Sequence, residues 1–394
     1  MSPTPANVLR GGVLFAVAGI AVLIATGVGG FRNPPQFFFS WLYAVLFWLG
    51  LSLGCLAVTM IHLLAGGRWG YPTRRFLEAG YRVLPVMLVL FIPVFFGLRE
   101  IYPWARPAEV AADPVLRHRQ AYENAPWYIV RTLVFFAVWI GMAMALRRWS
   151  LEQDRTADGA PTRKARTVSG PGLVLYGLTG TFASVDWIVS LEKDWKSTMF
   201  GVIFLIGQIL AAYAFAVVLL TLYRRSPPLA GIVDRTQYHH LGNLLLAFVL
   251  FWTYVSFGQL LIIYSGDLPH ELSWYLHRIA GSWKRVIGAV ALFHFFLPFL
   301  LLLVRAIKRS IPALTTLAAV LLGMRAVDAY WLVMPSLHPL GPAPSWMDFG
   351  AILGMGALWL GCFLWQLSLA PLVPKNDPGR QFSFVYGKRI QSTT

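Results

Sequence analysis

Long apolar segments separated by short polar ones recur along the whole chain. The first covers about residues 11–30. Nine more follow, at about 38–66, 81–98, 127–146, 171–190, 197–223, 240–264, 280–304, 311–335 and 347–370. A helix that crosses the hydrocarbon core of a bilayer needs about 20 mostly apolar residues. The pattern therefore predicts an all-α integral membrane protein with about ten transmembrane helices, forming a single polytopic domain over residues 1–394.

The length of these segments argues against two other interpretations. Spans of a transmembrane β-barrel are about 10 residues long and alternate strictly between apolar and polar positions, whereas these segments are longer and do not alternate. Helices also satisfy every backbone hydrogen bond without water. The first segment exceeds the roughly 7–15 apolar residues of a signal peptide, so we expect an uncleaved first span.

The composition and the distribution of charge support a membrane protein and predict its orientation. Only 13% of the 394 residues are charged, against about 25% in soluble domains. The net charge is +16. With ten spans, 21 lysines and arginines fall on the side of the two termini and 10 on the opposite side. Because cytoplasmic loops carry the excess of basic residues, we expect both termini in the cytoplasm, and nucleic-acid binding is the weaker interpretation of the charge.

No motif for a metal or cofactor is present in the sequence. Cys55 and Cys362 lie in apolar segments, and no C-x-x-C pair occurs. A haem held by two histidines needs them at equal depth on facing helices. His62 and His240 both lie near the cytoplasmic face, so one pair is conceivable, but His294 has no partner at its own depth and no single helix carries the spacing for two haems. We therefore expect this chain to bind no haem, iron–sulfur cluster or metal ion.

Polar side chains within the apolar segments are the candidate functional residues, because an ionisable group at membrane depth is costly. From the helical rise of about 1.5 Å per residue, they occupy different depths between the two faces. As candidates for a proton path we name His62, Asp186, Tyr254, Gln259, His294, Arg325 and Asp328.

Each of these groups also has a purely structural interpretation. Arg325 and Asp328 are spaced i, i+3 and share a helix face, so they form either an ion pair that holds the helices together or part of a proton path. The histidines are either proton carriers or hydrogen-bonded core residues. Asp186 either exchanges protons with the outer face or is locked to Arg325 or Arg131.

Several stretches are more specific than composition. They are Ser184-Val-Asp186-Trp187-Ile-Val-Ser190-Leu-Glu192, Trp195-Lys-Ser197-Thr198-Met-Phe-Gly201, Tyr238-His239-His240-Leu-Gly242-Asn243, Tyr264-Ser-Gly-Asp267-Leu-Pro269, Trp274-Tyr275-Leu-His277-Arg278 and Arg325-Ala-Val-Asp328-Ala-Tyr330-Trp331. In this order they resemble the F subunit (ActF) of the bacterial alternative complex III, a quinol:cytochrome c oxidoreductase. That subunit belongs to the broader NrfD/polysulfide-reductase-C group.

The resemblance carries expectations about fold, location and partners. It implies two four-helix bundles, made by helices 2–5 and 6–9, with helices 1 and 10 at the periphery, in the bacterial inner membrane. It implies a paralogous NrfD-like membrane subunit (ActC), an iron–sulfur subunit, haem c subunits and small membrane anchors as partners. The haem c and the iron–sulfur clusters belong to those partners, and menaquinol or ubiquinol is the substrate of the complex.

The implied function is that of a cofactor-free, non-redox membrane subunit of a respiratory or photosynthetic quinol:electron-acceptor oxidoreductase, which scaffolds the assembly and takes part in proton conduction. Two alternatives remain open. The chain is a quinone-binding subunit of the same complex, or it is a stand-alone secondary transporter, whose fold would show broken helices around a site near the membrane midplane.

Overall fold

The computed structural model describes residues 5–267 and 269–377. The described part of the chain is helical and contains no strand. It holds ten helical segments long and apolar enough to cross a membrane: Val8–Gly30, Pro34–Ala65, Gly70–Phe96, Ala125–Gln153, Ala160–Leu191, Phe200–Tyr223, Arg235–Gly266, Trp283–Leu303, Ile311–Ser336 and Trp346–Ser368. The expected all-α membrane architecture with ten spans is confirmed. Of the basic residues behind the predicted orientation, Arg380, Lys388 and Arg389 lie outside the described ranges.

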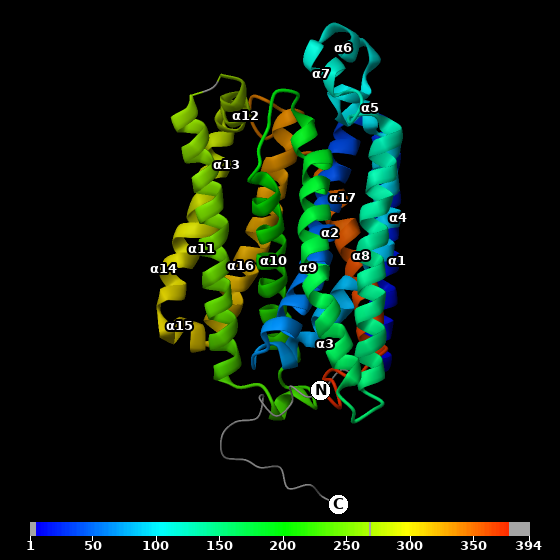
Figure 1. The fold of residues 1–394 in the computed structure, drawn as a ribbon, viewed down its shortest axis with the longest axis vertical. Coiled ribbons are helices and arrows are strands. Elements are labelled where there is room, and N and C mark those ends of the chain that lie inside the picture. Colours follow the sequence, from blue (N-terminus) through cyan, green and yellow to red (C-terminus); the bar gives the residue numbers. More distant parts are fainter. Residues whose placement is uncertain (1–4, 268, 378–394) are drawn as a thin grey trace, which may run out of the picture.

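Two groups of helices stand side by side (Figure 1). The first helix group contains α2 (Pro34–Ala65), α3 (Gly70–Tyr81), α4 (Leu84–Phe96), α8 (Ala125–Gln153) and α9 (Ala160–Trp187). The second helix group contains α10 (Phe200–Tyr223), α11 (Arg235–Gly266), α13 (Trp283–Val290), η4 (Ala291–Phe296), α14 (Leu297–Leu303), α15 (Arg305–Arg309) and α16 (Ile311–Val333). α2 and α10, which are mostly buried, pack against each other where the groups meet.

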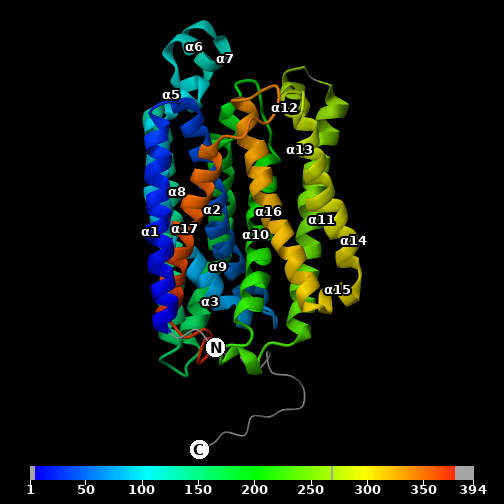
Figure 2. The same cartoon turned by 180° about the vertical axis from the view of Figure 1, so that it is seen from behind.

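Close helix crossings depend on glycine. A Cβ at Gly54 of α2 would lie 2.0 Å from the carbonyl oxygen of Gln208 on α10, so only glycine allows this approach. α1 (Pro5–Gly30) packs along α17 (Trp346–Ser368) at the edge of the first helix group (Figure 2). There a Cβ at Gly19 would lie 2.5 Å from the backbone nitrogen of Leu358. Small residues at such crossings are typical of helix packing in membranes.

The two ends of the helix bundle differ. α1 begins and α17 ends at the same end, which also holds α15 and which we call the inner end (Figures 1 and 2). The opposite, outer end carries α12 (Pro269–Ile279) and a short extension built from α5 (Leu98–Ile101), α6 (Pro107–Ala112) and α7 (Pro114–Arg119).

Some helices are longer than their apolar segments. The third span begins at Gly70 rather than near residue 81, and it breaks between α3 and α4, where Pro85 removes a backbone donor. The fifth begins at Ala160 rather than near residue 171. In both cases the additional turns carry arginines, which lower the hydropathy of the sequence without ending the helix.

Candidate functional site

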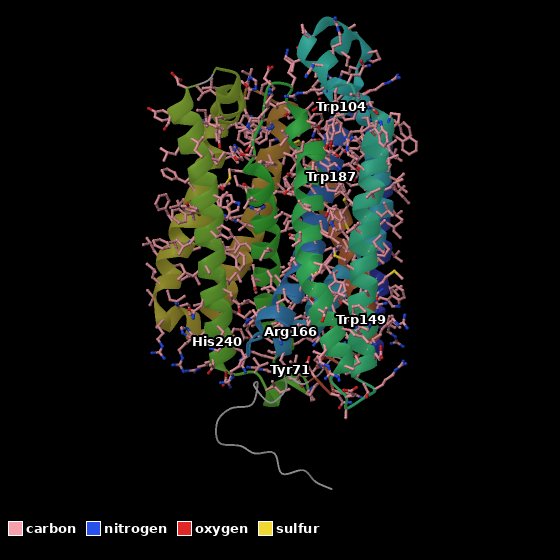
Figure 3. The ribbon with its side chains drawn as sticks, viewed as in Figure 1. Tyr71, Trp104, Trp149, Arg166, Trp187 and His240 are labelled. Atoms are coloured by element: carbon pink, nitrogen blue, oxygen red, sulfur yellow. The ribbon has the colours of Figure 1, made fainter. Side chains whose placement is uncertain are left out.

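Five of the seven candidate residues lie together in the second helix group. Tyr254 and Gln259 are on α11, His294 is on η4, and Arg325 and Asp328 are on α16. The other two are in the first helix group. His62 lies near the inner end of α2, and Asp186 lies in the outer part of α9, next to Trp187, which is labelled in Figure 3. The structure therefore does not arrange the seven residues as one continuous path.

Arg325 and Asp328 form an ion pair within α16. The Arg325 Nη1 atom lies 2.9 Å from the Asp328 Oδ2 atom, and both side chains are buried. The guanidinium lies against Gly207 of α10, where a Cβ would come within 2.2 Å of its Nη2 atom. The missing side chain at Gly207 therefore makes the room that the arginine occupies. In a region of low dielectric constant each charge needs the other to remain ionised.

His294 is fully buried, and neither of its ring nitrogens has a hydrogen-bond partner among residues 5–267 and 269–377. Its ring centroid lies 4.3 Å from that of Trp252, and the Arg325 guanidinium carbon lies 5.8 Å from the same indole. The helix is π-wound over Ala291–Phe296. Pro298 explains the irregularity, because it lacks the N–H that would reach the carbonyl of His294. Single π turns are frequent at functional sites.

A cavity of about 620 Å³ opens between α11, α12, η4 and α16 in the outer half of the second helix group. Most of the side chains that line it are apolar or aromatic. Polar side chains also line it, among them those of Asp328, Gln259, Ser256 and Tyr275. Tyr254 also borders the cavity, but 75% of this residue is exposed, so it faces the lipid side. The cavity joins the buried ion pair of α16 to the outer ends of α11 and α12.

A short chain of hydrogen bonds lines the outer wall of this cavity. Ser197 donates to the Oε1 atom of Gln259 at 2.8 Å, and the Gln259 Nε2 atom donates to the Tyr275 hydroxyl at 3.1 Å. Burial raises the pKa of Tyr275 to about 12. The tyrosine therefore stays protonated at neutral pH and is available as a donor.

Arg278 closes the outer end beside this chain. Its Nη1 atom lies 2.7 Å from Glu192 Oε1, and its Nη2 atom donates to the Leu332 carbonyl at 2.9 Å. His277 Nδ1 lies 3.0 Å from the other Glu192 oxygen. Burial lowers the pKa of the Arg278 guanidinium to about 10, and Glu192 opposes that effect. Arg278 thus remains charged at neutral pH and ties α12 to the segment after α9 and to α16.

Asp186 is held by one arginine at two points. The Arg131 Nε and Nη2 atoms of α8 lie 2.8 and 3.0 Å from its two carboxylate oxygens. The same guanidinium stacks on the ring of Tyr122, with its central carbon 3.9 Å from the ring centroid. Of the two arginines considered as partners, Arg131 is the one in contact.

His62 is separate from the other candidates. It is half-buried, its Nε2 atom lies 3.2 Å from the carbonyl oxygen of Gly67, and its ring packs edge-on against Trp69, with centroids 5.0 Å apart. These contacts fix the turn between α2 and α3.

The densest charge network lies at the inner end of the first helix group. The Glu78 carboxylate accepts hydrogen bonds from Arg74 (3.0 Å), Arg75 (2.6 Å), Arg147 (2.9 Å) and Ser150 (2.5 Å). Two further ion pairs extend this network, one between Arg74 and Asp377 and one between Arg75 and Asp154. Tyr71, labelled in Figure 3, donates to the carbonyl of Pro374 at 3.0 Å. Residues 374–377 are thereby fastened to α3 and α8.

Among the described residues, no group of three or more His, Cys, Asp or Glu side chains could hold a metal ion. The expectation that this chain binds no cofactor stays a prediction.

No model of a known protein family matches the chain, and no curated protein matches it.

Several residues in and beside the second helix group were not among the sequence candidates. Trp252, which contacts His294, and Ser197, Tyr275 and Arg278 around the cavity belong to this set. A signal for three of them was available, because Ser197, Tyr275 and Arg278 lie in the specific stretches quoted above. Their position at span ends, where polar residues are ordinary, gives the sequence alone no reason to single them out.

Proposed function

We propose that this chain is the non-redox membrane subunit of a quinol:electron-acceptor oxidoreductase complex, with an NrfD-like fold, and that its second helix group exchanges protons between Asp328 and the outer face. The assignment to such a complex rests on the sequence resemblance, and one structural observation carries the proton role. The buried Asp328–Arg325 pair opens on a cavity of about 620 Å³ whose outer wall holds Gln259 and Tyr275.

The geometry provides the elements that proton exchange needs. The cavity has room for several water molecules, and Asp328, Ser256 and Gln259 supply polar partners that ordered waters require. The Arg325 guanidinium, 2.9 Å away, favours the charged form of the Asp328 carboxylate, which burial disfavours. When Asp328 takes up a proton from the cavity, that pair loses its charge attraction, and the arginine is left facing Trp252 and His294.

The two-group helix arrangement fits this assignment, and the partners we propose are those that the sequence resemblance implies. In the proposed complex, haem c and iron–sulfur subunits transfer the electrons from menaquinol or ubiquinol, and the paralogous membrane subunit (ActC) stands beside this chain. Both termini face the cytoplasm of a bacterium, and the extension formed by α5–α7 lies on the opposite side.

Quinone binding by this chain is the second candidate function, and the same cavity favours it. Ligand sites are typically concave and apolar, with a few polar groups that fix the orientation of the ligand. The Tyr275 hydroxyl and the Gln259 amide are hydrogen-bond donors at the wall of an apolar space. A quinone ring carries two carbonyl acceptors that match such donors.

The test uses the complex purified from its own membranes and reconstituted in vesicles with quinol and an acceptor. Asp328→Asn leaves Arg325 without its counter-charge, so we expect a lower yield of assembled complex. In the complex that does assemble, quinol oxidation should persist while proton release per electron falls, as followed with a pH-sensitive dye. Asp328→Glu, which keeps an exchangeable proton, should restore the release. Unchanged proton release in Asp328→Asn would refute the proton role.

Two further results separate the alternatives. A raised KM for quinol in both Tyr275→Phe and Gln259→Leu, with proton release per electron unchanged, would favour quinone binding in the cavity. If the chain purifies without electron-transfer subunits and drives solute uptake by itself, it is a secondary transporter, and the proposal fails.

A further inference from the structure

A second pocket, of about 640 Å³, lies at the inner end of the second helix group. It is formed where α10 ends, α11 begins and α15 joins α16. Three arginines line it: Arg224 just after α10, Arg235 at the start of α11 and Arg309 at the end of α15. The remaining lining residues, among them Ser310 and Pro312, carry no charge.

The positive charge of this pocket is not balanced by carboxylates. Within the described part of the chain, none of the three arginines forms an ion pair. The nearby carboxylate of Asp234 accepts from the backbone of Thr236 (2.7 Å) and Gln237 (3.2 Å), so it is engaged as the cap of α11. The first helix group differs, because there Arg74, Arg75 and Arg147 share Glu78. The second helix group thus keeps a concave site with three free guanidinium groups.

Guanidinium groups are well suited to phosphate oxygens, which they bind with paired, charge-assisted hydrogen bonds. Basic pockets between transmembrane helices at a cytoplasmic boundary are a recognised setting for lipid head groups. The chemistry of the pocket therefore points to a phosphate-bearing ligand.

The surroundings favour a lipid over a soluble phosphate compound. The pocket lies at the edge of membrane-spanning helices, and exposed apolar side chains adjoin it in the sequence. Leu222 precedes Arg224 by two residues and is 69% exposed. Leu303 and Val304, also exposed, come directly before α15. A lipid whose phosphate occupies the pocket could lay its acyl chains along these side chains, whereas a soluble compound would leave them unused.

We propose that this pocket binds the phosphate of an anionic phospholipid. The bound head group would neutralise the charge of the three arginines. It would also link the α10–α11 connection to the junction of α15 and α16, two basic segments that repel each other when the pocket is empty. α15 depends on such support, because Val304, before it, and Ser310, after it, are both extended and interrupt the helix. The site is independent of the cavity on the outer side and of the function proposed for it.

The test compares lipids on the full chain, purified with the subunits that accompany it and delipidated in a neutral detergent. Phosphatidylglycerol and phosphatidylcholine are added separately, and retained lipid is measured by native mass spectrometry. We expect the wild type to bind phosphatidylglycerol at least about tenfold more tightly. Inorganic phosphate is the third probe, and at equal concentration it should not displace the lipid.

The variant Arg224→Gln/Arg309→Gln should lose most of this preference, to within about twofold. The matched control, Arg10→Gln/Arg148→Gln, removes two exposed arginines from the same end of the molecule and should retain it. Circular dichroism verifies that the variants are folded. If the double variant does not fold, the single exposed change Arg309→Gln is used, with an expected loss of about threefold or more.

Three results would overturn the proposal. The first is a wild type without preference for phosphatidylglycerol, and the second is an arginine variant that keeps the preference. The third is displacement of the lipid by inorganic phosphate at equal concentration, which would indicate a site for free phosphate.

Discussion

Arg131 on α8 contacts both carboxylate oxygens of Asp186 on α9, at 2.8 and 3.0 Å. The carboxylate is almost completely buried, while the arginine is 18% exposed. The pair connects two neighbouring helices in the outer half of the first helix group. This geometry favours the locked anion among the two roles that the sequence leaves open for Asp186.

Asp186→Asn should therefore destabilise the protein, because it leaves Arg131 without its counter-charge. Breaking one partner of a buried pair costs about 3–5 kcal/mol, and we expect the lower end of that range since Arg131 is partly exposed. Thermal unfolding in detergent and the yield of assembled complex measure the effect. The double variant Arg131→Gln/Asp186→Asn should recover part of the loss. Full assembly of Asp186→Asn with slowed proton movement would instead support a relay.

Gly207→Ala should disturb the Arg325–Asp328 pair without changing either residue. The new methyl group would lie 2.2 Å from the Arg325 Nη2 atom, so the guanidinium must move. Overpacking of this kind costs about 1–3 kcal/mol, measurable as a lower unfolding temperature. Gly323→Ala on α16 is the matched control, because its Cβ would have open space. Equal stability of the two variants would contradict the placement of Arg325.

Glu123→Gln should stabilise the protein at neutral pH and have little effect near pH 4. Burial raises the pKa of Glu123, and the Arg119 guanidinium only partly opposes this. Between the unfolded and folded pKa values the folded state holds more protons, so the stability of the wild type falls as pH rises through that window. The glutamine variant removes this loss. Unfolding temperatures of both proteins at the two pH values test the prediction, and a difference that grows towards pH 4 would refute it.

The orientation is tested by fusions to alkaline phosphatase, which is active only after export. A fusion at the C-terminus should be inactive, since the excess of basic residues predicts a cytoplasmic end. A fusion within the α6–α7 extension at the outer end should be active. The reverse pattern would invert the orientation and every depth derived from it.

The spans were predictable from the sequence because apolar length alone decides whether a segment can cross a membrane. The start of the third span was not. Arg74, Arg75 and Glu78 read as a polar loop, yet they lie buried in α3, because their charges compensate one another and Arg147 and Ser150 complete the set. A hydropathy average treats each residue independently, so it cannot detect charges that neutralise one another.

The approximate depth of each candidate residue in the membrane could be predicted from the sequence, but the contacts between residues of different helices could not. The spacing of Arg325 and Asp328 on one helix predicted their proximity, and the structure places them 2.9 Å apart. The contact of His294 with Trp252 and the cavity between α11 and α16 depend on how separate helices face each other. No periodicity within a single segment contains that information.

The network around Glu78 also sets an order of events during synthesis. Arg74 and its partner Asp377 are 303 positions apart in the chain. At a synthesis rate of about 5–20 residues per second, the aspartate emerges roughly 15–60 s after the arginine. The inner end of the first helix group therefore reaches its final form only after the last of the ten spans, Trp346–Ser368, has been synthesised. A ribosome that stalls between the last span and residue 377 would leave a protein with its spans inserted but without the Arg74–Asp377 contact. Quality-control proteases could recognise such a defect.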